Sequence, residues 1–273
     1  MSDMTFKIGF AAFGENEEKA AEVPPAAEET KLRSSVVQVR FPERGMPLSY
    51  YNDRFDLHCG DFVYVEGKLE GKRGVVTGVD YNFHIRLADY KRVIGVADTR
   101  VNGQFHFAGS HFITFDRNAL PREKAVSWFK APAKPEDEYV SGSDEAAFPL
   151  QNLSEMHIDR EKAERGSVYY ADNRVRYLCL DGTKGYAIVE GTSAYDVEFT
   201  YSDGAVSAMS CSCYCAGACK HEYAVMLQLR ETLECVEESY ADEYADTGYF
   251  AAVSKDAFFT FAVGSKKSGT ITL

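Results

Sequence analysis

The stretch MSCSCYCAGACKH, residues 209–221, joins a strand-like sequence to a helix-like one and is dense in potential metal ligands. Cys211 and Cys213 are two residues apart, so in a strand both sulfurs point to the same face. After a tight turn, Cys219 and His221 fall at the predicted start of a helix, where free backbone N–H groups favour a thiolate. Three thiolates and one neutral imidazole make the closed tetrahedral shell of a structural zinc site. We therefore predict that these four side chains hold one structural Zn²⁺.

Cys215 in the same stretch offers a fifth sulfur. If Cys213 and Cys215 formed the first ligand pair, only three residues would remain before Cys219, a cramped loop for a tetrahedral site. We prefer Cys211, and whether Cys215 substitutes as a ligand stays open. A different interpretation of the cysteines in this stretch is that they are small buried apolar side chains. The isolated cysteines, in apolar or helical contexts, are predicted to be ordinary core or surface residues, and these are Cys59, Cys179 and Cys235.

The sequence on either side of this stretch predicts a sheet followed by a helix. Strands at 175–180 and 186–190 flank the turn sequence Asp181-Gly182-Thr183-Lys184-Gly185. Apolar and polar residues alternate over 195–201, and Asp203-Gly204 then turns the chain into a further strand that ends at the first ligand pair. This ββ(β)α order is that of a small zinc-finger module. Its helix is predicted from apolar residues at helical spacing, Val225, Met226, Leu229 and Leu233.

The ligand stretch resembles the SWIM zinc finger, whose pattern is C-x-C, a variable spacer and C-x-H. The resemblance covers about residues 155–231 and also includes Gly166-Ser-Val-Tyr-Tyr and Val189-Glu-Gly191. The spacer of five residues is shorter than usual, and Tyr214 stands where the family commonly has proline. SWIM fingers often lie beside Swi/Snf-type helicases or in transposases. The resemblance therefore implies binding to DNA or to protein.

The N-terminal part of the chain, residues 34–129, is predicted to be a small β-barrel module. Short β-branched and aromatic runs at 62–65, 75–79 and 83–87 are punctuated by glycines at hairpin spacing. The stretch 60–76 resembles the small five-stranded barrels of KOW type. The sequence before it resembles the barrel that opens the primosomal helicase, a DNA-binding domain. Together with the zinc-finger module, these features predict an α+β fold.

Cations interleaved with aromatic residues make the barrel module the candidate nucleic-acid interface. Such a surface can follow phosphates and stack bases. A solvated charged face explains the same pattern about equally well. The candidate residues are Lys68, Lys72, Arg73, Arg86, Lys91 and Arg92.

Composition divides the chain into five segments. Residues 14–31 are acidic, rich in alanine and contain Pro24-Pro25, which predicts a flexible tail. Residues 130–149 contain three prolines and five acids, which predicts a linker. Near the C-terminus, 249–253 and 257–263 are predicted to form a strand pair whose phenylalanines need a partner surface. The predicted segments are an acidic tail at 1–33, the barrel module at 34–129, a linker at 130–152, the zinc-finger module at 153–233 and an acidic, β-like tail at 234–273.

The chain has 273 residues, of which 45% are hydrophobic and 26% charged, values typical of globular proteins. Its net charge of −12 excludes a uniformly basic nucleic-acid binder. No run of 18 apolar residues exists, so no membrane partner is expected. The N-terminal sequence does not resemble a secretory signal, and we therefore expect a cytoplasmic location. Five of the seven cysteines fall between Cys211 and Cys235, which indicates metal binding and not a disulfide framework.

No sequence pattern supports a catalytic site. In the stretch 67–73 the glycines are too close for a phosphate-binding loop, and Val225 stands where a metalloprotease helix needs its second histidine. Asp61 with Glu70 and Lys72 weakly resembles a metal-dependent nuclease. We therefore predict no enzyme and no small-molecule substrate.

The predicted function is that of a non-catalytic zinc-binding adaptor. Its partner would be nucleic acid or a nucleic-acid-handling protein, of which a Swi/Snf-type helicase is one candidate. The alternative is a pure protein-protein interaction module with structural zinc, which the net charge of −12 and the apolar C-terminal tail favour. A cryptic metal-dependent nuclease is the weakest alternative.

Overall fold

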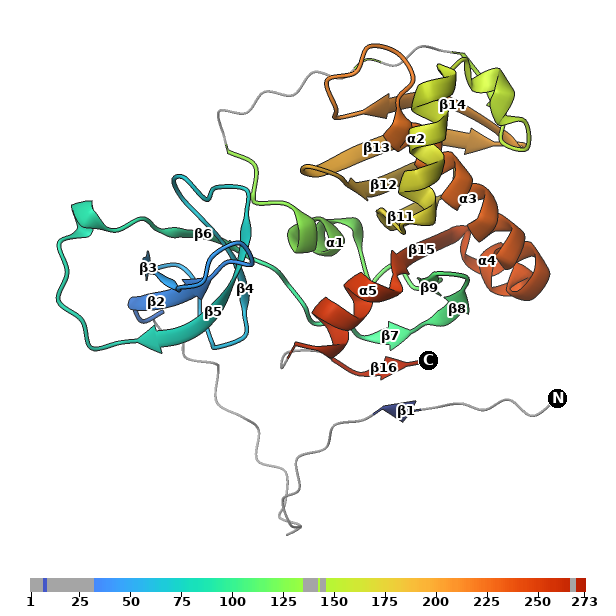
Figure 1. The fold of residues 1–273 in the computed structure, drawn as a ribbon. Helices are drawn as coiled ribbons and strands as arrows, with labels where there is room; N and C mark the ends of the chain where they lie inside the picture. The colour runs from blue at the N-terminus through green and yellow to red at the C-terminus, as the bar shows by residue number, and fades with distance from the viewer. Residues whose placement is uncertain (1–6, 9–31, 135–141, 143–145, 266–268) are drawn as a thin grey trace, which may run out of the picture. The chain divides into compact units, whose positions relative to one another are not determined.

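The computed structural model describes residues 7–8, 32–134, 142, 146–265 and 269–273 (Figure 1). These residues form both helices and sheets, which confirms the predicted α+β class. Most of the predicted acidic tail and the middle of the predicted linker lie outside the described residues. The chain divides into two compact units, one of Ile8–Ala97 and a larger one that takes in Asp98–Leu273.

The smaller unit is an antiparallel sheet with the strand order β3-β2-β5-β4-β6. Its core consists largely of β-branched residues such as Val37 and Val63, because strands bury alternate side chains and β-branched residues pack well there. The edge strands meet at an isolated parallel bridge between Tyr51 and Arg92, which does not close the sheet into a barrel. The strands are β2 (Ser35–Arg40), β3 (Leu48–Asn52), β4 (Phe62–Val65), β5 (Arg73–Asp80) and β6 (Val93–Val96).

The strand that the sequence predicts at 83–87 does not form. The chain there is a loop that runs into a short 3-10 helix, Leu87–Asp89. The place beside β4 is taken by β6, whose Val93 is fully buried, whereas Phe83 is only half-buried. Apolar alternation alone does not show which of two neighbouring runs finds a pairing partner.

The larger unit is built on one eight-stranded antiparallel sheet with the order β10-β14-β13-β12-β11-β15-β9-β8. Both predicted turns are present, with Gly182 between β11 and β12, and Asp203 and Gly204 between β13 and β14. These residues have positive φ angles, which glycine and aspartate adopt more readily than other residues. The strands are β8 (His106–Ala108), β9 (His111–Thr114), β10 (Phe148–Pro149), β11 (Val175–Asp181), β12 (Lys184–Glu190), β13 (Ala194–Ser202), β14 (Ala205–Cys211) and β15 (Tyr249–Ser254).

Helices α2 (Arg160–Ala171) and α3 (Lys220–Ser239) cover one face of this sheet (Figure 1). Val225, Met226 and Leu229 of α3 enter the same buried cluster as Leu178 of β11 and Val197 of β13. Removing this apolar surface from water is the main favourable contribution to the stability of the unit. No helix among the described residues combines the length and apolar character needed to cross a bilayer.

The opposite face of the sheet carries aromatic and cationic side chains near α1. The Tyr177 hydroxyl donates to a carbonyl of the chain just before α1 at 3.0 Å. The Arg122 guanidinium lies 3.7 Å from the centroid of the Tyr186 ring, and Trp128 stacks on Phe261 with centroids 5.0 Å apart. The helices are α1 (Arg122–Phe129), α2 (Arg160–Ala171), α3 (Lys220–Ser239), α4 (Ala241–Thr247) and α5 (Lys255–Phe258), with a 3-10 helix at Leu153–Met156 and a π-helical turn at Phe259–Val263.

The C-terminal segment differs from the predicted strand pair. Its first strand forms as β15, inside the large sheet between β11 and β9. Residues 255–263 are helical because Phe258, Phe261 and Ala262 recur at helical spacing and are buried together. The partner surface of Phe258 and Phe261 is therefore the core of this unit, whereas Phe259 of the same run is exposed. The last strand, β16 (Ile271–Thr272), belongs to a small sheet in the order β1-β16-β7 with β1 (Lys7–Ile8) and β7 (Gly103–Gln104).

The boundary between the two units does not coincide with a boundary between the predicted segments. The boundary after Ala97 lies inside the predicted barrel module of 34–129. Residues 98–129 join the larger unit, because β9 pairs with the distant β15. Phe148 and Leu150, at the end of the predicted linker, are buried in the same core. Both differences come from pairing and packing partners far along the chain, which local composition does not reveal.

His111 of β9 is expected to make the larger unit sensitive to acid. Its Nε2–H donates to the Val175 carbonyl at 2.8 Å, its other ring nitrogen contacts the Ser110 hydroxyl at 2.9 Å, and burial lowers its pKa to about 4. Because the ordinary pKa is 6.5, the unfolded chain binds a proton between pH 6.5 and 4 that the folded chain does not. We therefore expect His111 to lower the free energy of unfolding by about 3 kcal/mol as the pH falls through this window.

Chemical denaturation across the same pH window measures this loss. His111→Gln keeps a polar side chain that cannot titrate, so its pH slope should be shallower than that of the natural protein. The matched control is His84→Gln, which changes an exposed histidine of the smaller unit and should leave the slope of the larger unit unchanged. An identical slope in His111→Gln and the natural protein would contradict the prediction.

Candidate metal centre

The structure brings the four predicted ligands together where β14 leads into α3. Cys211 is the last residue of β14, Cys213 lies in the turn that follows, Cys219 caps the N-terminus of α3 and His221 is the second residue of that helix. One ligand atom from each of the four lies within 4.8 Å of the others. Nδ1 of His221 is 3.7 Å from Sγ of Cys211 and 3.8 Å from Sγ of Cys219.

These separations fit a single metal ion. Tetrahedral zinc, with sulfur near 2.3 Å and nitrogen near 2.0–2.1 Å, holds a sulfur and a nitrogen ligand about 3.6 Å apart. The two observed sulfur–nitrogen distances are close to this value, so the cluster could bind a metal ion with little rearrangement. With all four side chains bound, a tetrahedral ion would have no position left for water or substrate.

The turn that carries Cys213 is anchored to the rest of the sheet. The Ser212 N–H donates to the Asp196 carbonyl at 2.9 Å, and the Ser212 hydroxyl accepts from the Asp196 N–H at 2.9 Å. The Asp196 carboxylate accepts a hydrogen bond from the Tyr186 hydroxyl at 2.7 Å and forms an ion pair with Lys130. The metal-binding turn is therefore connected to β12 and to the end of α1.

A β-bulge in β14 precedes the first ligand. Thr200 of β13 pairs with Ser207 of β14, and Glu198 pairs with Ser210. Between these two pairs, β14 contains two residues, Ala208 and Met209, where β13 contains one. Ala208 has φ 49°, in the left-handed region that residues with a Cβ enter at a cost. Because side chains alternate along a strand, the extra residue decides on which face the Cys211 sulfur lies.

We expect Ala208→Gly to raise the free energy of unfolding of the larger unit by roughly 0.5–1 kcal/mol. Glycine relieves the left-handed strain, and part of the gain is offset by its greater freedom in the unfolded chain. The matched control is Ser210→Gly in the same strand, which has no positive φ angle and should be destabilised. Urea denaturation of both variants tests this, and a loss of stability in Ala208→Gly would contradict it.

A capping box fixes the start of α3 and with it the second ligand pair. The Cys219 N–H donates to the Glu222 carboxylate at 2.6 Å, and the Glu222 N–H donates to the Cys219 sulfur at 3.5 Å. The Lys162 ammonium of α2 donates to the carbonyls of Ala216 and Ala218, each at 3.4 Å. The loop between the two ligand pairs is therefore held from both α2 and α3.

Two tyrosines orient the imidazole of His221. The Tyr195 ring stacks on it with centroids 4.2 Å apart and planes at 18°, and the Tyr169 ring approaches edge-on at 5.4 Å. Nε2 of His221 is buried without a hydrogen-bond partner, whereas Nδ1 faces the sulfurs. Tyr169 lies in the sequence stretch that resembles the finger, but the contact of either tyrosine with the imidazole was not predicted, because the two tyrosines come from α2 and β13 and meet the histidine only in the folded protein.

The environment of the cluster disfavours charge on its ligands. Burial raises the pKa of Cys213 to about 11. A hydrogen bond with Cys211, together with burial, raises the pKa of Cys219. Burial lowers the pKa of His221 to about 4, and the neighbouring Lys220 charge adds to this effect. The imidazole is thus in its neutral, metal-binding form, and the thiols need a cation beside them to lose their protons readily.

Cys215 is exposed and is not part of the cluster of four. Its backbone forms a hydrogen bond with the Cys213 side chain, which lowers the pKa of Cys213 and partly opposes the effect of burial. In the structure, therefore, Cys215 contributes to the centre through its main chain.

The six candidate nucleic-acid residues lie on loops and one strand of the smaller unit. Intramolecular partners already engage several of them, including Lys72 with Glu43 and Arg86 with Asp89, the latter at 3.9 Å. Such pairs reduce the positive charge that the surface offers to phosphates. Lys68 and Lys72 lie between β4 and β5, Arg73 begins β5, and Arg86, Lys91 and Arg92 lie between β5 and β6.

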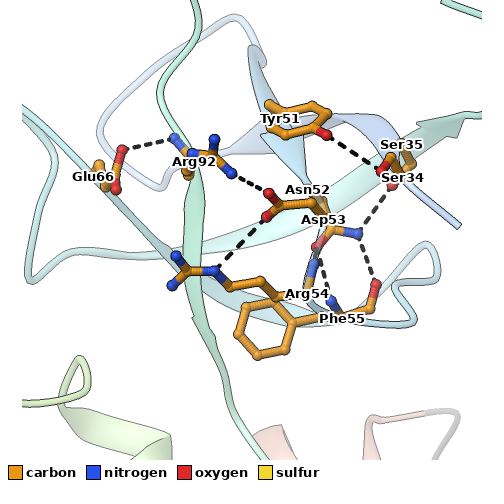
Figure 2. A network of polar contacts seen from close by, with 9 residues as sticks. All are labelled: Ser34, Ser35, Tyr51, Asn52, Asp53, Arg54, Phe55, Glu66 and Arg92. Atoms are coloured by element: carbon orange, nitrogen blue, oxygen red, sulfur yellow. Dashed lines mark hydrogen bonds and ion pairs between the residues drawn. The ribbon is translucent and has the colours of Figure 1, made fainter. Parts of the chain in front are cut away.

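Arg92 is part of a polar network within the smaller unit (Figure 2). Its guanidinium forms an ion pair with Asp53, and its backbone N–H donates to the Glu66 carboxylate at 3.2 Å. Asn52, the residue before Asp53, is buried, and its side-chain amide donates to the Ser35 hydroxyl at 3.0 Å. A phosphate would therefore have to compete with Asp53 for Arg92.

Among the described residues, no second group of three or more histidine, cysteine or acidic side chains is close enough to hold a metal ion. Asp61, which belongs to the nuclease-like triplet of the sequence, accepts the His58 N–H at 2.8 Å and stabilises the turn before β4. The Cys₃His cluster is therefore the candidate site within the part of the chain that the structure describes.

Comparison with family models, with curated proteins and with solved structures finds no match for this chain.

Proposed function

We propose that the metal is zinc and that residues 153–233 act as a SWIM-type finger in which zinc has a structural role. Three sulfurs and one imidazole are the soft, mixed donor set that suits tetrahedral zinc. The observation that carries the proposal is the four-ligand cluster, with Nδ1 of His221 turned toward the sulfurs. The C-x-C and C-x-H spacing of the ligands supports the same assignment.

Metal analysis of the purified protein tests this proposal. We expect one zinc per chain, and replacement by Co²⁺ should give the visible absorption of a tetrahedral thiolate site. Cys211→Ser should lower zinc content and affinity, whereas Cys215→Ser should leave both unchanged. Full zinc retention in Cys211→Ser together with loss in Cys215→Ser would instead make Cys215 the ligand.

We infer further that the protein is a non-catalytic adaptor that binds nucleic acid or a nucleic-acid-handling protein such as a Swi/Snf-type helicase. The finger motif supports this inference, as does the small five-stranded sheet of the other unit with its cationic and aromatic loops. On one of these loops, the half-exposed Tyr81 lies under Arg33, whose guanidinium carbon is 4.5 Å from the ring centroid. A closed metal shell supports a non-catalytic role, because it offers no position for a reacting group.

A pure protein-protein interaction module remains the alternative. The net charge of −12 favours it, and so does the internal pairing of Lys72, Arg86 and Arg92 with carboxylates. The apolar C-terminal tail supports it only through Phe259, which is 51% exposed, since Phe258 and Phe261 are buried in the core of the larger unit.

Binding of the zinc-loaded protein to single- and double-stranded DNA across a salt series separates the two. If phosphate contacts exist, affinity should fall linearly with salt on a log–log plot. Lys68→Ala with Arg86→Ala should then weaken binding and lower the slope by about two. Arg100→Ala with Lys134→Ala, a pair of exposed cations outside both the candidate loops and residues 153–233, is the control. Absence of binding at low salt would overturn the nucleic-acid proposal.

A further inference from the structure

A pocket of about 550 Å³ lies in the larger unit and is lined by none of the four metal ligands. One wall comes from β7, β8, β9 and the loop that follows β9, and the other comes from α4. The volume is in the range of sites that hold small organic molecules or single side chains of a partner.

The apolar part of this pocket comes from the rings of His106 and Phe115, whose centroids are 5.8 Å apart. The His106 ring also packs against Tyr240, which does not line the pocket, with centroids 5.0 Å apart. Burial lowers the pKa of His106, so at neutral pH this ring adds no positive charge to the pocket. Flat rings of this kind pack against alkyl chains and against the faces of planar cations.

The polar part of the pocket is negative. Asp116, Glu243 and Asp246 all line it, and none of the three forms an ion pair within the described part of the chain. The one cation in the lining, Arg117, is engaged by Asp181 at 2.6 Å and by the Thr247 carbonyl at 2.9 Å. The electrostatic potential inside the pocket therefore favours a cationic ligand.

The spacing of the carboxylates favours an organic cation over a metal ion. Among the described residues, Asp116, Glu243 and Asp246 do not form a group close enough to hold one metal ion. An extended organic cation can place an alkyl chain on His106 and Phe115 while its charged end reaches the acidic rim.

We propose that this pocket binds an alkyl guanidinium or alkyl ammonium group, with Glu243 and Asp246 of α4 facing the charge. The site is independent of the zinc centre and of the proposed adaptor function. Such a group could come from a free polyamine or from an arginine or lysine side chain of a partner, so the test needs both sources.

Isothermal titration of the zinc-loaded full chain with spermidine, and separately with N-acetylarginine amide, tests this site. We expect saturable binding of at least one probe at low salt, and the better probe identifies the source. Glu243→Gln with Asp246→Asn should raise its dissociation constant about tenfold, as expected for loss of two partly exposed charge contacts.

The matched control is Glu238→Gln with Asp242→Asn, which removes two nearby acidic charges that do not line the pocket. It should leave the dissociation constant within twofold of the natural value. Equal weakening in both double variants would reduce the effect to general charge attraction and overturn the site. No heat from either probe, or undiminished binding in the pocket variant, would overturn it as well.

Discussion

Loss of the metal is expected to lower the free energy of unfolding of the larger unit by on the order of 10 kcal/mol, the largest effect that we predict for this protein. Without a cation, three thiols and an imidazole remain packed together between β14 and α3 with no ion to hold them. A loss of this size is comparable to the whole stability of a typical domain, so the larger unit should be largely unfolded or only marginally folded after chelation. The end of β14 and the first turn of α3 should then open first.

Calorimetry and amide hydrogen exchange before and after chelation measure this effect. The thermal midpoint of the larger unit should fall steeply. The unit of Ile8–Ala97 contains none of the ligands, so its thermal midpoint should not change. Cys219→Ala should reproduce the chelated state, and Cys235→Ala is the control outside the cluster. An unchanged midpoint after verified metal removal would contradict a structural role for the metal.

Gly166→Val is expected to destabilise the larger unit by about 3 kcal/mol and to weaken metal binding at the same time. A Cβ at this position of α2 would lie 2.9 Å from the Lys220 carbonyl oxygen and 2.9 Å from the Tyr223 Cβ. Both contacts are with the first turn of α3, so relief of the clash has to move α2 away from the helix that carries Cys219 and His221. The missing side chain is therefore what allows α2 to approach the metal-binding turn.

Ser167→Val is the matched control, because it places the same side chain at the next, exposed position of α2. Its free energy of unfolding should stay within about 0.5 kcal/mol of the natural value, since serine and valine have similar helix propensities. Urea denaturation and a competition assay for zinc give the two readouts. Equal stability of the two variants would show that α2 can shift without cost.

The parts of the fold that could be predicted are those with local signals. The turn at Asp181-Gly182 and the alternation over 195–201 specify their strands within a few neighbouring residues. Helix α2 was not predicted, because Gly166 interrupts it and few of its residues are buried. The place of β15 between β11 and β9 depends on pairing with Ile113 and Leu178, far away in sequence, which no local pattern reveals.

The cluster of four side chains was predictable because paired spacing brings cysteine and histidine to one point at a strand-to-helix junction. The groups that hold these side chains in place were not. Tyr195 and Asp196 belong to β13, and Lys162 belongs to α2, so each reaches the centre only through tertiary packing. For the cationic loops of the smaller unit, the sequence shows the charges but not the carboxylates, such as Asp53, that pair with them.

The position of β15 also has a consequence for synthesis of the protein on the ribosome. When the nascent chain has emerged only as far as α4, it contains β9 and β11 but not β15, the strand that lies between them in the sheet. Each of these two strands then exposes an unpaired edge. Those edges and the apolar faces beside them can recruit neighbouring chains until translation reaches residues 249–254. Ribosome stalling or premature termination shortly before Tyr249 should thus yield aggregation-prone fragments, which holdase chaperones would have to shield.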